Sequence, residues 1–186
     1  MNRKLFDYIA ASPSPYHAVH HSAEKLRAAG FLPLSEGEDW DLTPGQGYYV
    51  TRNGSSLIAF RAKRDFSGFL MTASHCDSPT FKIKENAELT GSGCRRLAVE
   101  KYGGMLMSTW MDRPLGIAGR VLLRKGSGIE SRLLDLGGAC AVIPNVAIHM
   151  NRKANDGYAW NPAVDLLPLW GAGEEKGFFR PTLAMA

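Results

Sequence analysis

Residues 68–79 read Gly68-Phe69-Leu70-Met71-Thr72-Ala73-Ser74-His75-Cys76-Asp77-Ser78-Pro79, and they are the strongest local indication of fold class. An apolar run as short as residues 69–73 favours a buried β-strand over a helix. Pro79 would stop the strand, because proline has no N–H to donate to a ladder. The segment therefore predicts a buried strand with polar residues at its C-terminal end, which is where α/β sheets place their ligands.

His75 and Asp77 form the sharpest chemical pattern in the chain. Residues i and i+2 of an extended segment share a face, so both side chains can point into one pocket. A histidine can bind a metal through one ring nitrogen while a carboxylate fixes the other nitrogen. The spacing fits a structural His–Asp pair equally well, and both interpretations stay open. Cys76 points to the opposite face of such a strand, which indicates a small buried hydrophobe rather than a nucleophile.

The other histidines are weaker candidates. His17, His20 and His21 fall in one predicted helix, and His17 and His21 share a face, but the glutamate of an HExxH motif is missing between them. We therefore expect surface histidines there. His149 lies between two apolar residues, and its neighbours alone indicate a core histidine.

Local signals place the first elements. Ser14 and Pro15 predict the N-cap and first turn of a helix that ends at Gly30. Asn53-Gly54 predicts a hairpin that joins strands at residues 48–52 and 56–60.

After Pro79 the sequence is rich in predicted strands. This change predicts a second structural unit, with the boundary between the two units near residues 85–95. Residues 165–170 are apolar, residues 171–186 show no clear period, and residues 169–186 form an atypical tail. Strand-like runs separated by glycines lie at residues 81–84, 97–102, 116–124, 129–134 and 145–150.

Composition excludes several classes of protein. The 186 residues are 45% hydrophobic and 22% charged, with 22 basic and 18 acidic residues interspersed. This balance is typical of a globular protein and gives no concentrated basic face for nucleic acid. The sequence has neither a membrane-spanning apolar run nor a signal peptide, and its three cysteines form no CxxC pair. We expect a cytoplasmic protein with no nucleic-acid or membrane partner.

Five segments, in this order along residues 4–168, resemble the N-terminal part of the aspartyl aminopeptidase family of zinc metallo-aminopeptidases. They are Ala10-Ala11-Ser12-Pro13-Ser14-Pro15-Tyr16-His17-Ala18, Ala73-Ser74-His75-Cys76-Asp77-Ser78-Pro79, Val99-Glu100-Lys101-Tyr102-Gly103-Gly104, Trp110-Met111-Asp112-Arg113-Pro114-Leu115 with Gly119-Arg120-Val121, and Ile143-Pro144-Asn145-Val146-Ala147-Ile148-His149-Met150-Asn151-Arg152.

The resemblance implies an α/β fold in which an α/β/α peptidase domain is interrupted by a β-rich dimerisation or assembly domain. Residues 1–90 would be the N-terminal part of the zinc peptidase domain, residues 91–168 part of the β-rich domain, and residues 169–186 an atypical tail that no longer matches the family.

The implied chemistry is the removal of N-terminal Asp or Glu from peptides by a homo-oligomer with two Zn²⁺ ions. The resemblance makes His75 a zinc ligand and Asp77 the catalytic residue that orients it. His149 would either bind metal or act catalytically at the active site of a neighbouring subunit.

The resemblance also implies what is missing. Family members are more than twice as long, and neither their remaining metal ligands nor their general-base glutamate has a counterpart here. A catalytic zinc site has about three protein ligands and a base, so we expect this chain to be truncated and inactive alone. The alternatives are another zinc exopeptidase and a non-catalytic β-rich assembly or interaction module.

Overall fold

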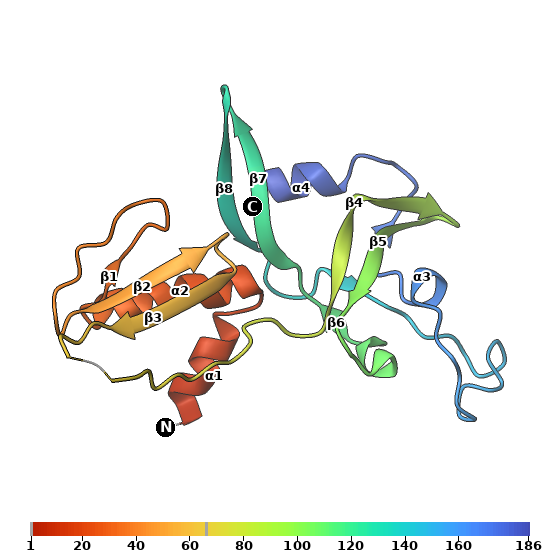
Figure 1. The fold of residues 1–186 in the computed structure, drawn as a ribbon. Helices are drawn as coiled ribbons and strands as arrows, with labels where there is room; N and C mark the ends of the chain where they lie inside the picture. Colours follow the sequence, from red (N-terminus) through yellow and green to blue (C-terminus); the bar gives the residue numbers. More distant parts are fainter. Residues whose placement is uncertain (1, 66) are drawn as a thin grey trace. The chain divides into compact units, whose positions relative to one another are not determined.

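The computed structural model describes residues 2–65 and 67–186 and shows a mixed α/β fold, as predicted (Figure 1). The chain forms two compact units. Unit 1 comprises the residues up to Ser78 together with Leu122–Leu133, and unit 2 comprises Pro79–Val121 and Leu134–Ala186. Within the described residues, every helix is too short or too polar to span a bilayer.

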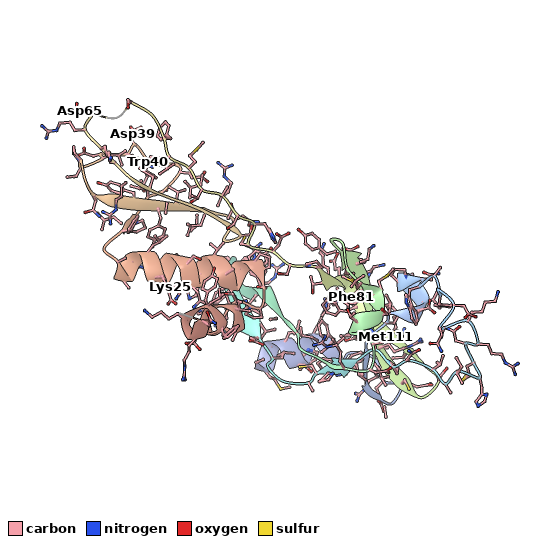
Figure 2. The ribbon with its side chains drawn as sticks, turned by 90° about the horizontal axis from the view of Figure 1, so that it is seen from below. Lys25, Asp39, Trp40, Asp65, Phe81 and Met111 are labelled. Carbon is pink, nitrogen blue, oxygen red and sulfur yellow. The ribbon has the colours of Figure 1, made fainter. Side chains whose placement is uncertain are left out.

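Two helices open unit 1. The first, α1 (Asn2–Ala10), was not predicted, whereas α2 (Pro15–Ala28) confirms the predicted helix. Ser14 is the N-cap of α2, and its Oγ accepts a hydrogen bond from the His17 backbone N–H at 3.4 Å. Lys25 of α2, labelled in Figure 2, places its Nζ 5.5 Å from the centre of the Tyr8 ring of α1.

Unit 1 also contains a three-stranded sheet in the order β1-β2-β3. The hairpin is confirmed: Asn53 and Gly54 adopt φ of 53° and 64°, and the Ser55 N–H donates to the Arg52 carbonyl at 3.1 Å. Helix α2 packs on β2 and β3. This packing buries Ala18, Val19 and Ala23 of the helix and Tyr48, Tyr49 and Val50 of β2. The strands are β1 (Leu32–Pro33), β2 (Gly47–Arg52) and β3 (Ser56–Arg61).

The predicted strand at residues 69–73 is wrong. The segment has no regular secondary structure, and Phe69, Leu70 and Met71 are 80%, 101% and 83% exposed. An extended apolar run becomes a strand only when a neighbour supplies hydrogen bonds and covers a face. The described residues form no ladder with this segment, so its apolar side chains remain in water.

Unit 2 is built on a five-stranded antiparallel sheet in the order β4-β5-β10-β9-β6. Buried Ala87, Leu97, Val99 and Phe179 form its hydrophobic core. The strands are β4 (Thr80–Gly91), β5 (Cys94–Tyr102), β6 (Pro114–Leu115), β9 (Ala141–Val142) and β10 (Leu169–Ala172); the helices are η1 (Met107–Trp110), α3 (Pro162–Asp165) and α4 (Phe179–Met185). A separate hairpin joins β7 (Ala118–Lys125) to β8 (Gly128–Asp135), and its residues Leu122–Leu133 belong to unit 1.

The join between the units differs from the one expected near residues 85–95. Hairpin β4–β5 spans that region, with a register shift between Ile83 and Glu88, and the chain first passes from unit 1 to unit 2 between Ser78 and Pro79. The assignment of residues 1–90 to a peptidase domain and residues 91–168 to an assembly domain stays a prediction.

Residues 169–186 are an integral part of unit 2 rather than a loose tail. Strand β10 pairs with both β5 and β9, and Phe179 of α4 is 6% exposed. The carboxylate of Glu88 on β4 accepts the backbone N–H groups of Phe179, at 2.8 Å, and Gly177. These bonds hold the pKa of Glu88 below its ordinary value. The segment was missed because its order depends on partners far away in the sequence.

The predicted strand at residues 145–150 is also wrong. Residues 144–147 are irregular and residues 148–150 form a turn, which the Met150 N–H closes by donating to the Ala147 carbonyl at 2.8 Å. Pro144 supplies no N–H at the start of this segment, which removes one of the donors that a strand there would need.

Candidate functional site

His75 and Asp77 lie on the irregular segment of unit 1 that precedes β4, and their side chains face each other as predicted. The His75 Nδ1 lies 2.7 Å from the Asp77 backbone carbonyl and 3.0 Å from Asp77 Oδ1. Both oxygens are acceptors, so Nδ1 carries the proton and donates it. In the neutral ring, Nε2 then has an available lone pair, which is the state of a metal-binding histidine. The position at a strand end was wrong, but the orientation of the pair does not need the strand.

Cys76 is exposed, so the buried-hydrophobe interpretation is wrong. Its Sγ donates to the Ser55 carbonyl at 3.2 Å. Ser55 follows the turn at Asn53 and Gly54, so this contact joins the His75 segment to the tip of hairpin β2–β3.

The His75–Asp77 pair could supply only part of a metal site. The His75 side chain is 80% exposed and the Asp77 side chain 35% exposed, so the imidazole is open to solvent. Among the residues that the structure describes, no group of three His, Cys, Asp or Glu side chains could hold a metal ion. His75 thus has the hydrogen bond of a metal-binding histidine, with Asp77 behind it, but the described residues do not gather a set of three ligands.

The histidines of α2 have other partners. The ring of His17 is buried and places Nδ1 2.7 Å from the Ser14 Oγ at the N-cap. His20 and His21 form side-chain contacts to Glu24 at 3.4 and 3.2 Å. The expectation of surface histidines holds for His20 and His21. It is wrong for His17, which is buried and contacts the N-cap residue Ser14.

His149 belongs to unit 2, whereas His75 and Asp77 belong to unit 1. It is exposed on the turn at residues 148–150, so its apolar neighbours do not make it a core residue. Of the predicted site residues, the structure brings together His75 and Asp77. The roles of all three at a metal or in catalysis stay predictions.

Asp112 was not predicted as a site residue, yet it contacts the segment that carries His149. Its Oδ1 accepts the Asn145 N–H at 2.7 Å, and its own N–H donates to the Ile143 carbonyl at 2.9 Å. Asp112 follows Met111, which is labelled in Figure 2. The available signal was its place in the segment Trp110–Leu115, which carried part of the family resemblance.

A shallow hollow of about 410 Å³ also lies in unit 2. None of His75, Asp77 and His149 lines it, so it is not the predicted catalytic site. Its walls are Asp112, Arg113, Pro114, Ala139, Cys140, Ala141, Val142, Leu169, Trp170 and Gly171.

Known relatives account for nearly the whole chain. The family described as aminopeptidase I zinc metalloprotease (M18) matches residues 8–181. The match continues beyond residue 168, so the expectation that the tail leaves the family pattern is wrong. A probable M18 family aminopeptidase 2 of Pseudomonas putida (strain GB-1) is 44% identical over 188 residues, which cover 98% of this chain and 44% of that protein.

Solved structures agree with this assignment. Chaetomium thermophilum mApe1 is 29% identical with a TM-score of 0.83, over 97% of this chain and 43% of that one. The S. cerevisiae mApe1 dodecamer is 34% identical with a TM-score of 0.69, over 79% and 36%. The chain therefore spans less than half the length of these relatives. This chain belongs to the M18 family of zinc metalloprotease aminopeptidases.

Proposed function

We propose that this chain is the N-terminal part of a zinc aminopeptidase that removes N-terminal Asp or Glu from peptides. His75 is a zinc ligand, Asp77 orients its ring, and His149 acts at the active site of a neighbouring subunit. The observation that carries the proposal is the His75–Asp77 contact in a chain of this family. The preference for acidic residues rests on the sequence resemblance to aspartyl aminopeptidases.

The role of the pair follows from its hydrogen bonds. Asp77 offers two acceptor oxygens to Nδ1, which keeps the proton there and directs Nε2 away from the carboxylate. The carboxylate also raises the basicity of the ring, which strengthens it as a ligand. Zinc, when bound, supplies the Lewis-acid chemistry for peptide-bond hydrolysis. The two ions of the complete site need further ligands, which the rest of a longer protein would provide.

The proposed role of His149 depends on assembly of the protein into a homo-oligomer. His149 is exposed and lies in the β-rich unit, which is the proposed assembly domain inserted into an α/β/α peptidase domain. The S. cerevisiae relative is a dodecamer. This supports a homo-oligomer in which His149 of one subunit reaches the active site of a neighbouring subunit. We place the complete protein in the cytoplasm, with acidic N-terminal peptides as its substrates.

The first experiment tests inactivity of the chain alone. Purified chain with added zinc is incubated with matched peptides that begin with Asp, Glu or Leu. We expect negligible release of the first residue, because one ligand cannot hold zinc in a catalytic coordination. Release that survives purification and disappears in His75→Ala would contradict this expectation.

A chimera tests the site itself. Residues 1–181 of this chain replace the matched N-terminal segment of the Pseudomonas putida relative. We expect release of Asp and Glu, and a loss of at least about a hundredfold in kcat/KM for His75→Ala and for His149→Ala. His20→Ala, an exposed histidine on α2, is the matched control and should retain activity.

The chimera also separates the alternatives. Faster release of Leu than of Asp would indicate another zinc exopeptidase. An oligomer of correct mass without peptidase activity would support the non-catalytic assembly module. Mixing the His75→Ala and His149→Ala chimeras should restore part of the activity if His149 acts on a neighbour, because mixed oligomers contain some intact sites.

A further inference from the structure

We propose that Asp112 is a positioning residue that fixes the turn carrying His149. The inference rests on the proposed function for the importance of His149, but its structural content concerns the Asp112 contacts alone. Asp112, Asn145 and His149 all belong to unit 2, so the argument does not depend on how the two units are placed.

Asp112 binds the start of the His149 segment at two points. Its backbone N–H donates to the Ile143 carbonyl at 2.9 Å, and its Oδ1 accepts the Asn145 N–H at 2.7 Å. Met111 and Ile143 also form a parallel bridge. Ile143 is 0% exposed, so this end of the segment is fixed in the interior of unit 2.

Pro144 makes the side chain of Asp112 more important. Proline has no N–H, so Asn145 carries the first backbone donor after Ile143. Asp112 accepts that donor with a carboxylate oxygen, and hydrogen bonds to charged acceptors are the stronger kind. Within residues 2–65 and 67–186, the loss of this acceptor would leave the backbone pairing at Ile143 as the hold of residues 111–112 on the segment.

Short-range hydrogen bonds carry the order from Asn145 to His149. The Asn145 Oδ1 accepts the Val146 N–H at 2.9 Å, and the Met150 N–H closes the turn on the Ala147 carbonyl at 2.8 Å. His149 is the residue just before that donor. The position of the imidazole thus depends on a chain of contacts that begins at Asp112.

The exposure of the turn explains why the hydrogen bonds of Asp112 are needed to hold it. Val146, Ile148 and Met150 are 51%, 47% and 79% exposed, so side-chain burial does little to hold the turn. Asp112 itself has φ of 55°, a left-handed conformation that Asp adopts more readily than most residues. Any replacement must therefore satisfy both the acceptor and the backbone.

The test uses three variants of the full 186-residue chain. Asp112→Asn keeps an acceptor oxygen and tolerates the left-handed backbone. Asp112→Gly keeps the backbone and loses the acceptor, and Asp112→Ala loses both. Asp135→Gly is the matched control, because Asp135 Oδ1 accepts the Gly137 N–H at 2.8 Å elsewhere in unit 2.

Amide hydrogen exchange by NMR is the first measurement. We expect the Asn145 amide to exchange about tenfold to a hundredfold faster in Asp112→Gly and Asp112→Ala. Asp112→Asn should stay within about threefold of the native chain, because an amide oxygen still accepts the bond. The heteronuclear NOE of Ile148 and His149 should fall in the first two variants and be restored in Asp112→Asn, whereas Asp135→Gly should leave both signals unchanged.

Three results would overturn the proposal. The first is native-like exchange of Asn145 in Asp112→Gly, and the second is an Asp112→Asn variant as mobile as Asp112→Gly. The third is loss of protection throughout β4 and β5, which would make Asp112 a general structural residue. None of these results depends on peptidase activity, so the chimera can fail while this inference stands, and the reverse.

Discussion

Replacing Glu88 by alanine should weaken the attachment of α4 to the sheet of unit 2. The Glu88 carboxylate accepts backbone N–H groups from Gly177 and Phe179, the latter at 2.8 Å. A hydrogen bond to a charged acceptor contributes about 1.5–3 kcal/mol, and partial solvent exposure reduces this to about 1 kcal/mol for each bond here. Glu88→Ala should therefore weaken the attachment of α4 by about 2 kcal/mol, which corresponds to roughly thirtyfold faster amide exchange.

Hydrogen exchange with mass spectrometry on the peptide that covers α4 measures this effect. Glu88→Gln should give about half of it, because a side-chain amide offers one acceptor oxygen in place of two. Glu85→Ala, on the same strand and exposed, is the matched control and should leave α4 unchanged. Unchanged exchange of α4 in Glu88→Ala, or an equal effect in Glu85→Ala, would refute the reasoning.

The same contact predicts a pH dependence. Hydrogen bonds from the N–H groups of Phe179 and Gly177 lower the pKa of Glu88 in the folded state. A lowered folded pKa stabilises the native protein above the unfolded pKa, and this stabilisation is lost as the pH falls through the folded pKa. The difference in α4 protection between the native chain and Glu88→Gln should thus be largest near neutral pH and shrink in acid.

Three further substitutions test unit 1. Ser14→Ala removes the cap of α2 and should cost about 1 kcal/mol, measured by hydrogen exchange of the first helical turn. Gly47→Ala places a Cβ about 2.7 Å from the Phe31 ring and should lower stability by about 1–3 kcal/mol in urea unfolding, an effect that Phe31→Leu should partly relieve. Asn53→Val forces a branched side chain into φ of 53° and should cost about 1–2 kcal/mol in the same assay, more than Asn53→Gly, because glycine tolerates that backbone.

Features set by near neighbours could be predicted from the sequence. The cap at Ser14 and the turn at Asn53-Gly54 depend on a few adjacent residues, and both have the expected conformation. The contact of His75 with Asp77 also spans only two residues, so it forms although the strand before it does not.

Features that depend on distant partners could not be predicted in the same way. Residues 69–73 have the composition of a strand but no ladder within the described chain. Residues 169–172 have little strand pattern of their own and become β10 because β5 and β9 provide edges on both sides. The Asp112–Asn145 contact spans 33 positions, and only the fold could reveal it.

The place of β10 has a consequence for biosynthesis. This strand is a late element of the chain but lies inside its sheet, between β5 and β9. Translation must pass Ala172 before β5 and β9 can gain their shared neighbour, so a nascent chain carries the unpaired edge of β5 for most of the time that unit 2 is emerging, and later that of β9 as well. Such edges invite pairing with other chains.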